Sequence, residues 1–261
     1  MSFDFSKDAY FKTEEGREAY RRIQEYVKVY HRDLFDFLGI RWRGGDGSYR
    51  AVLDVGCSYG YMLELFREHG YEKLYGLDVS AYAITEARKN IDEAYLYIHD
   101  ATKPFPIPVN EKFDLVTCLG TLGLIENPEA VVRNCYNALK DGGTFICSGP
   151  SSERPFFFKM LRAKTAYRNA HSAKEWEGIL KKAGEWKELH VETVQRIPIP
   201  FSLSKKCLFV KTGFGDPVIM WGNKVRRPDV SGSGTASGMV VTKNLPADLS
   251  QQYSSRLVRK K

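Results

Sequence analysis

The chain has 261 residues, a formal net charge of +7 and a hydrophobic fraction of 43%, enough for a substantial core. No apolar run reaches the roughly 18 residues of a membrane-spanning helix, and residues 1–5 lack the basic and apolar regions of a secretory signal. The five scattered cysteines show no C-x-x-C spacing, which argues against a disulfide framework and a thiolate zinc site. We therefore expect a cytoplasmic protein without a metal site.

Helix-like and strand-like segments alternate along the chain. Residues 14–39 place apolar side chains at helical spacing and predict an N-terminal helix. Residues 51–55 form a short apolar run, as in strands buried on both faces. The remaining strands are expected at 73–77, 94–98, 113–119, 144–148, 188–194 and 207–210, and the remaining helices at 61–69, 81–90, 128–139 and 173–183. This order predicts an α/β fold with a doubly wound, mostly parallel, seven-stranded sheet.

Several local signals mark the ends of these elements. Ser172 with Glu175 forms a capping-box pattern at the start of the last helix, and Gly184 is expected to end that helix. Residues 141–143, Asp-Gly-Gly, are expected to turn the chain into the fifth strand. Residues 231–238 are rich in serine and glycine, which is typical of a flexible linker, although a short strand at 239–242 is plausible.

The turn after the first strand, residues 54–60, reads Asp-Val-Gly-Cys-Ser-Tyr-Gly. A glycine turn that leads into a helix start suits an anionic or carboxylate-bearing ligand. An NAD fingerprint would need glycine where Ser58 and Tyr61 stand. The turn formally matches the G-x-S-x-G nucleophile elbow of serine hydrolases, but it follows the first strand, with no earlier unit to supply an oxyanion loop. Nucleoside binding and a ligand-free turn also remain open.

Asp78 ends the next strand, where an acidic side chain can accept hydrogen bonds from ribose hydroxyls. Asp78 or Ser80 could instead cap the helix over 81–90. An acid here together with the glycine turn favours nucleoside binding.

With these motifs, residues 45–212 resemble a class I S-adenosylmethionine-dependent methyltransferase of the broad small-molecule type. The resemblance rests on residues 52–60, 113–119, 139–143 and 181–184, and Ser58 departs from it where glycine is commonest. It implies a Rossmann-like fold and S-adenosylmethionine as the cofactor. It divides the chain into an N-terminal helical lid (1–44), a cofactor-binding methyltransferase domain (45–228) and a flexible basic tail (229–261).

The resemblance also implies a set of cofactor-binding residues at the carboxyl ends of the first four strands: Asp54, Gly56, Cys57, Gly60, Asp78, Val79, Asp100, Ala101 and Leu119. By this resemblance, Asp54 and the turn hold the methionine part, Asp78 holds the ribose, Val79 packs on the adenine and Asp100 meets its amino group.

Methyl transfer from a sulfonium releases a neutral thioether, so the protein mainly aligns the acceptor, and a base helps if the acceptor carries a proton. Relatives often carry Leu-Glu-His after the fourth strand, whereas residues 122–124 here are Leu-Gly-Leu. His171 is the remaining candidate base, with a surface or capping histidine as the alternative.

Sequence motifs constrain the substrate only loosely. No base-methylation motif occurs at 118–121, so nucleic acid is a possible partner without motif support. The mixture of aromatic and basic residues over 150–168 fits a pocket for a small acidic or lipid-like substrate, or else a packed amphipathic helix. The basic tail favours an RNA or protein methyltransferase as an alternative, and a non-catalytic S-adenosylmethionine-binding module is another.

Overall fold

The computed structural model describes residues 14–39, 51–108, 110–153, 169–198, 207–212 and 217–226. Its strands are β1 (Ala51–Val55), β2 (Lys73–Asp78), β3 (Tyr95–Ile98), β4 (Phe113–Cys118), β5 (Leu139–Gly149), β6 (Trp186–Pro198), β7 (Cys207–Thr212) and β8 (Val218–Lys224). Its helices are α1 (Glu14–Phe37), α2 (Tyr61–Glu68), α3 (Ala81–Asn90), α4 (Pro128–Ala138), α6 (Ala173–Ala183) and the short 3₁₀ helix η3 (Leu122–Leu124).

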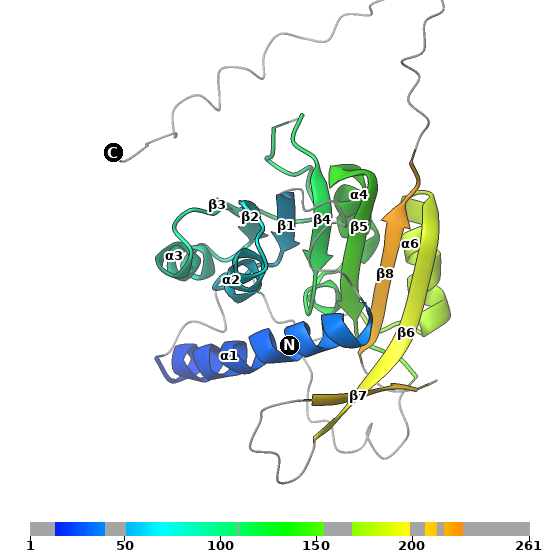
Figure 1. Cartoon of the computed structure of the whole chain (residues 1–261), viewed down its shortest axis with the longest axis horizontal. Coiled ribbons are helices and arrows are strands. Elements are labelled where there is room, and N and C mark those ends of the chain that lie inside the picture. The colour runs from blue at the N-terminus through cyan, green and yellow to red at the C-terminus, as the bar shows by residue number, and fades with distance from the viewer. Residues whose placement is uncertain are drawn as a thin grey trace, which may run out of the picture. The chain divides into compact units, whose positions relative to one another are not determined.

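The strands form one sheet in the order β3-β2-β1-β4-β5-β8-β6-β7 (Figure 1). The first five in this order are parallel to one another. β8 is antiparallel to both β5 and β6, so β6 runs in the direction of the first five strands, and β7 is an antiparallel edge strand. The predicted α/β fold with a mostly parallel sheet is confirmed.

The predicted number of seven strands is wrong, because the described residues form eight. The missing strand is β8, whose sequence Val-Ile-Met-Trp-Gly-Asn-Lys has only four consecutive apolar residues before Gly222 and Asn223. Pairing on both sides, from Thr144 to Gly149 of β5 and along β6, holds this segment extended. A local pattern does not report such distant pairing.

Helices cover both faces of the sheet. Leu53 and Val55 of β1 point into a core that α4 and α6 close, whereas Val52 points into a core shared with α2 and α3. This alternation follows from the two-residue period of a strand. Each face is therefore sealed by apolar side chains, and functional groups are left to the ends of the strands.

The helix α1 lies against the α2 and α3 side and extends to β7 (Figure 1). Near its C-terminal end, Leu34 and Phe35 are fully buried. Its middle is held by Lys28, whose Nζ lies 3.2 Å from Glu64 Oε2. At its start, the Arg17 guanidinium lies over the Tyr82 ring of α3 at 4.7 Å. All the described residues belong to one compact unit, 1–227. The lid assigned to 1–44 stays a prediction.

The capping box at Ser172 is confirmed, because the Ser172 hydroxyl accepts from the Glu175 amide and Glu175 Oε2 accepts from the Ser172 amide. The turn expected at 141–143 is instead an irregularity inside β5, where Gly142 has φ +80° and the register with β4 shifts. The basic tail, the suggested strand at 239–242 and residues 154–168 lie outside the described residues.

Candidate functional site

The glycine turn lies at the carboxyl end of β1 and contains both of its glycines in the left-handed conformation. Gly56 and Gly60 have φ of +81° and +82°, a region that glycine reaches without a Cβ penalty. A Cβ on Gly56 would collide with the side chain of Thr121. The amides of Gly56 and Cys57 both donate to the carbonyl of Leu77 in β2, at 2.8 and 3.1 Å. The turn is thereby fixed to the neighbouring strand.

Asp54 precedes this turn and is a buried carboxyl group, 4% exposed. The Thr117 hydroxyl of β4 donates to Asp54 Oδ1 at 2.6 Å. Desolvation raises the pKa of Asp54 to about 7, because burial penalises the charged form more than the Thr117 hydrogen bond favours it, and the charge of Asp78 adds to the rise. A cationic ligand would reverse this penalty.

Asp78 ties the turn to the start of α3. Its Oδ2 accepts from the Ser58 amide at 3.0 Å and its Oδ1 accepts from the Ser80 amide at 2.9 Å. The N-cap of α3 is Ser80, whose hydroxyl accepts from the Ala83 amide at 3.1 Å. Because Ser80 caps the helix, the Asp78 carboxylate is held instead beside the glycine turn, between two strand ends.

Two aliphatic side chains are exposed next to Asp78. Val79 is 38% exposed, and Ile98, the register partner of Asp78 on β3, is 54% exposed. The family resemblance pointed to Val79 but not to Ile98, although an apolar residue at a strand end, two positions before Asp100, was a usable signal. Such a pair can receive the flat apolar faces of a nucleobase.

Asp100 and Ala101 follow β3. Asp100 Oδ1 accepts from the amide and the hydroxyl of Thr102 at 2.9 and 2.8 Å. Partial burial acts to raise the pKa of Asp100, but these two hydrogen bonds outweigh it and the pKa lies below its ordinary value. The carbonyl of Ala101 accepts from the Asn134 amide group at 2.9 Å. This loop is therefore fixed against α4 with a charged carboxylate.

The segment after β4 approaches the glycine turn from the other side. The Thr121 hydroxyl lies 3.4 Å from the Val55 carbonyl and 3.3 Å from that of Leu119. Leu119 itself is partly buried against the core on the α2 side. The structure thus brings Leu119 and the turn close through Thr121.

Cys57 is a core residue of the turn. Its thiol is buried, and a Cβ on Gly76 of β2 would lie 2.8 Å from its sulfur, so the glycine makes room for it. Burial raises the pKa of the Cys57 thiol, and the charges of Asp78 and Asp54 act in the same direction. The group is therefore a neutral thiol, and any contact with a ligand falls to its backbone.

His171 lies apart from this cluster, between β5 and α6. Its ring packs edge-on against Trp176 with centroids 4.8 Å apart, and its Nδ1 lies 4.0 Å from Glu175 Oε2. Its backbone is tied to the end of β5, since its amide donates to Pro150 at 3.2 Å. The side chain is 28% exposed. It sits at the carboxyl end of β5, with its catalytic role still a prediction.

Ser58 bears on the hydrolase alternative. Its hydroxyl is buried and has no hydrogen-bond partner within the part of the chain that the structure describes. A serine nucleophile needs a base within hydrogen-bond reach, and none of the five histidines supplies one in the described ranges. The geometry does not support a nucleophile elbow.

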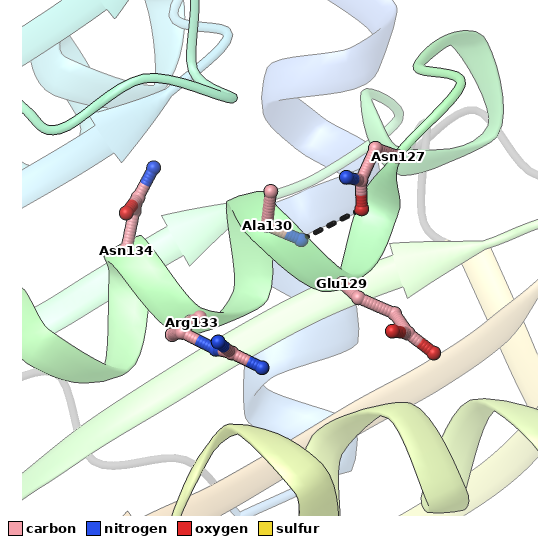
Figure 2. Close-up of a pocket in the computed structure, with 5 residues that line it drawn as sticks. All are labelled: Asn127, Glu129, Ala130, Arg133 and Asn134. Atoms are coloured by element: carbon pink, nitrogen blue, oxygen red, sulfur yellow. Dashed lines mark hydrogen bonds between the residues drawn. The ribbon is translucent and has the colours of Figure 1, made fainter.

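Two surface hollows lie elsewhere, along α4. One of about 190 Å³ is lined by Asn127, Glu129, Ala130, Arg133 and Asn134 (Figure 2). The dashed line in Figure 2 is the N-cap hydrogen bond from the Ala130 amide to Asn127 Oδ1, 3.1 Å long. The second, about 250 Å³, lies between α4 and residues 104–108 and 111–113. Neither includes a predicted site residue.

The described residues contain no cluster of three His, Cys, Asp or Glu side chains arranged to hold a metal ion. Within the same ranges, no helix has the length and apolar character needed to cross a membrane.

Comparison with known proteins shows the family of this chain. A family model described as a methyltransferase domain matches residues 22–192. The chain belongs to this methyltransferase family. The resemblance inferred from the motifs is thereby confirmed.

Curated relatives match over a shorter stretch. The ubiquinone biosynthesis O-methyltransferase of Glaesserella parasuis is 32% identical over 106 residues, which is 38% of this chain and 44% of the relative. That of Azoarcus is 34% identical over 108 residues, 38% of this chain and 43% of the relative. The chain therefore spans less than half the length of these relatives.

Solved methyltransferase structures match this chain over a larger share of its length than the curated relatives do. A SAM-dependent methyltransferase of Thermotoga maritima, a possible histamine N-methyltransferase, superposes with a TM-score of 0.59 at 22% identity, over 80% of this chain and 95% of that one. The magnesium protoporphyrin IX methyltransferase of Synechocystis with bound SAH has a TM-score of 0.56 at 16% identity, over 85% of this chain and 100% of that one. These likenesses support the Rossmann-like methyltransferase fold.

Proposed function

We propose that the protein is an S-adenosylmethionine-dependent methyltransferase that acts on a small molecule. The observation that carries the proposal is the pair of carboxyl groups, Asp54 and Asp78, fixed on either side of a left-handed glycine turn where β1 and β2 end. Ligands of open α/β sheets bind at this edge. Membership of the methyltransferase family supports the same reading.

The residues at this edge fit the chemistry of the cofactor. A carboxylate accepts up to about four hydrogen bonds, so Asp78 can hold two backbone amides and also receive ribose hydroxyls. Asp54, whose charge is costly in the absence of a cation, suits the positively charged methionine half. Val79 and Ile98 offer exposed aliphatic surface for adenine. The buried Ser58 hydroxyl, which has no hydrogen-bond partner among the described residues, also fits a ligand.

When bound, the cofactor supplies a methyl group on a sulfonium, and the leaving thioether is neutral. The protein then has to hold the acceptor in line with the methyl and exclude water. We assign the methionine half to Asp54 and the turn from Gly56 to Gly60, and the adenosine half to Asp78, Val79, Asp100, Ala101 and Leu119.

The small-molecule class is supported by the names of the curated relatives, which are O-methyltransferases of ubiquinone biosynthesis. The acidic or lipid-like character of the substrate rests on residues 150–168, of which 154–168 lie outside the described residues.

The test of this proposal is calorimetric titration with S-adenosylmethionine and S-adenosylhomocysteine. The wild-type chain is expected to bind both, and Asp78→Ala is expected to weaken both at least tenfold, since hydrogen bonds to a charged group contribute about 1.5–3 kcal/mol. Glu72→Ala, which removes an exposed carboxylate just before β2, is the matched control. Absence of any binding heat for the wild-type chain would end the proposal.

We also propose His171 as the base that accepts a proton from the acceptor. Its position at the carboxyl end of β5 supports this, because substrate has to approach from the same edge. His171→Ala is expected to lower turnover at neutral pH about 100-fold while cofactor affinity stays unchanged. Turnover equal to that of the wild type would remove His171 from the mechanism.

A further inference from the structure

The strand β3 forms one edge of the sheet, since within the described residues its only neighbouring strand is β2. A free edge presents backbone N–H and C=O groups with which another strand can pair, and natural edge strands are often protected by charged residues, proline or a bulge. β3 is short, reads Tyr-Leu-Tyr-Ile and contains none of these. The opposite edge strand, β7, carries Lys211, whose side chain is 49% exposed. The edge of β3 is therefore the less protected one.

Two hydrogen bonds show which backbone groups of β3 face outward. The His99 amide, just after β3, donates to the Asp78 carbonyl of β2 at 2.8 Å. Because backbone groups point alternately to the two sides of a strand, Leu96 and Ile98 direct their N–H and C=O groups away from β2. The Arg88 guanidinium of α3 donates to the Leu96 carbonyl at 3.4 Å, which agrees with this direction. The outer side of β3 thus offers backbone donors and acceptors to a further strand.

Tyrosine side chains line one face of this edge. Tyr95 is 55% exposed, and its ring stacks on that of Tyr75 in β2 with centroids 4.7 Å apart. Tyr97, two positions further along, is partly buried against the core on the α4 side. Tyrosine is enriched at protein interfaces, and aromatic pairs across antiparallel strands stabilise their association. β3 therefore combines a free backbone edge with an aromatic row.

This edge is complementary to itself. If two β3 strands pair antiparallel about a two-fold axis at Leu96, each Leu96 exchanges its N–H and C=O with the other as a hydrogen-bonded pair. Tyr95 then lies opposite Tyr97 of the second copy in a non-hydrogen-bonded pair, where side chains approach most closely. An axis at Tyr97 would instead place Tyr95 opposite His99, whose ring is turned against Phe105 at 6.4 Å. The tyrosine row therefore favours the axis at Leu96.

Charge and area set the strength of such a contact. The chain has a formal net charge of +7, so two copies repel each other in general, and a strand without charged side chains is where they meet at least cost. Arg88 opposes the contact, because it places a like charge on each side of the axis and competes for the Leu96 carbonyl. Four residues of β3 per copy bury less than the roughly 1,200 Å² of stable interfaces. The association is therefore weak and reversible.

We propose that two copies of the chain associate by antiparallel pairing of their β3 strands, centred on Leu96, into a weak dimer with one continuous sheet. This inference goes beyond the proposed function and does not depend on it. The carboxyl ends of the strands point in opposite directions in the two copies, so each copy keeps its own candidate site.

Sedimentation equilibrium of the full chain, from micromolar to millimolar concentration, tests the dimer. The wild-type chain is expected to show a reversible monomer–dimer equilibrium. Tyr95→Lys is expected to weaken it about tenfold, because it removes the tyrosine pair on both sides of the axis and charges the edge, whereas Arg88→Ala is expected to strengthen it. Val210→Lys, at an exposed apolar position of β7, is the matched control and should leave the equilibrium unchanged. Far-ultraviolet circular dichroism checks that each variant folds.

Cross-linking tests the register. In oxidised glutathione, a mixture of Tyr95→Cys and Tyr97→Cys is expected to form a disulfide-linked dimer, whereas either variant alone and the wild-type chain are not, since only opposite positions bring two Cβ atoms within disulfide reach. A chain that stays monomeric at every concentration refutes the proposal. So does a dimer that Tyr95→Lys leaves intact or that Val210→Lys disrupts. A mixture that forms no cross-link, or cross-linking of Tyr97→Cys alone, overturns the pairing centred on Leu96.

Discussion

Asp54 gives a sharp test of the electrostatics at the glycine turn. Its pKa in the folded chain is raised to about 7 from an ordinary value of 3.8, chiefly by burial. Between pH 3.8 and about pH 7, the Asp54 carboxyl group is therefore protonated in the folded chain but ionised in the unfolded chain. Stability from this group is fully present below about pH 4 and is lost as the pH rises through about 7.

Asp54→Asn removes the ionisation while keeping an oxygen that can accept from Thr117 Oγ1. A rise of about three pKa units lowers the free energy of unfolding by about 4 kcal/mol above pH 7. Most of this loss occurs between pH 5 and pH 8. Over that interval, ionisation of Asp54 alone should lower the free energy of unfolding of the wild-type chain by about 3 kcal/mol.

Urea unfolding without ligand, at pH 5 and at pH 8, measures this effect. The difference in unfolding free energy between Asp54→Asn and the wild type is expected to grow by about 3 kcal/mol over that interval, and this comparison cancels the titration of all other groups. Glu72→Gln, at an exposed carboxylate, should show no growth. A constant difference between Asp54→Asn and the wild type at both pH values would refute the assigned desolvation.

Three other changes test the surrounding structure. Gly56→Ala should cost about 2–4 kcal/mol, because the new Cβ meets Thr121 at a left-handed φ, and Thr121→Ala in the same chain should recover part of the loss in urea unfolding. Ser172→Ala should cost about 1 kcal/mol by removing the capping box, which a thermal melt detects. Burial lowers the pKa of His31 to about 4, so stability from this group is complete above about pH 6.5 and declines as the pH falls. His31→Gln should therefore lessen the loss of unfolding free energy between pH 7 and pH 4.5 by about 2 kcal/mol; an unaltered loss would contradict the burial of that ring.

The sequence predicted those parts of the fold that leave a local pattern. The five parallel strands and their helices were predicted because their patterns are local in the sequence. Examples are the fully buried run at residues 51–55 and the helical spacing of apolar residues in α1. The glycine turn and Asp78 were found because their chemistry stands in a short motif at two strand ends.

What the sequence did not reveal depends on contacts between distant residues. The hydrogen bond from Thr117 to Asp54 joins positions 63 residues apart, and the burial that raises the pKa of Asp54 is a property of the packed sheet. Ile98 was missed because its exposure at the end of β3 depends on the sheet ending there. That the Ser58 hydroxyl is buried with no partner among the described residues likewise depends on how distant segments pack around it.

The position of β8 has a consequence for biosynthesis. β5 lies inside the sheet, yet its second neighbour arrives late, since Asn223 meets Thr144 across 79 residues of chain. Until residues 218–224 have left the ribosome, one edge of β5 in the nascent chain has unpaired backbone N–H and C=O groups. These groups can pair with a strand of another chain. Closing so long a loop is slow. Versions cut before Val218 should therefore accumulate in inclusion bodies, and chaperones that shield strand edges should improve the yield of the full chain.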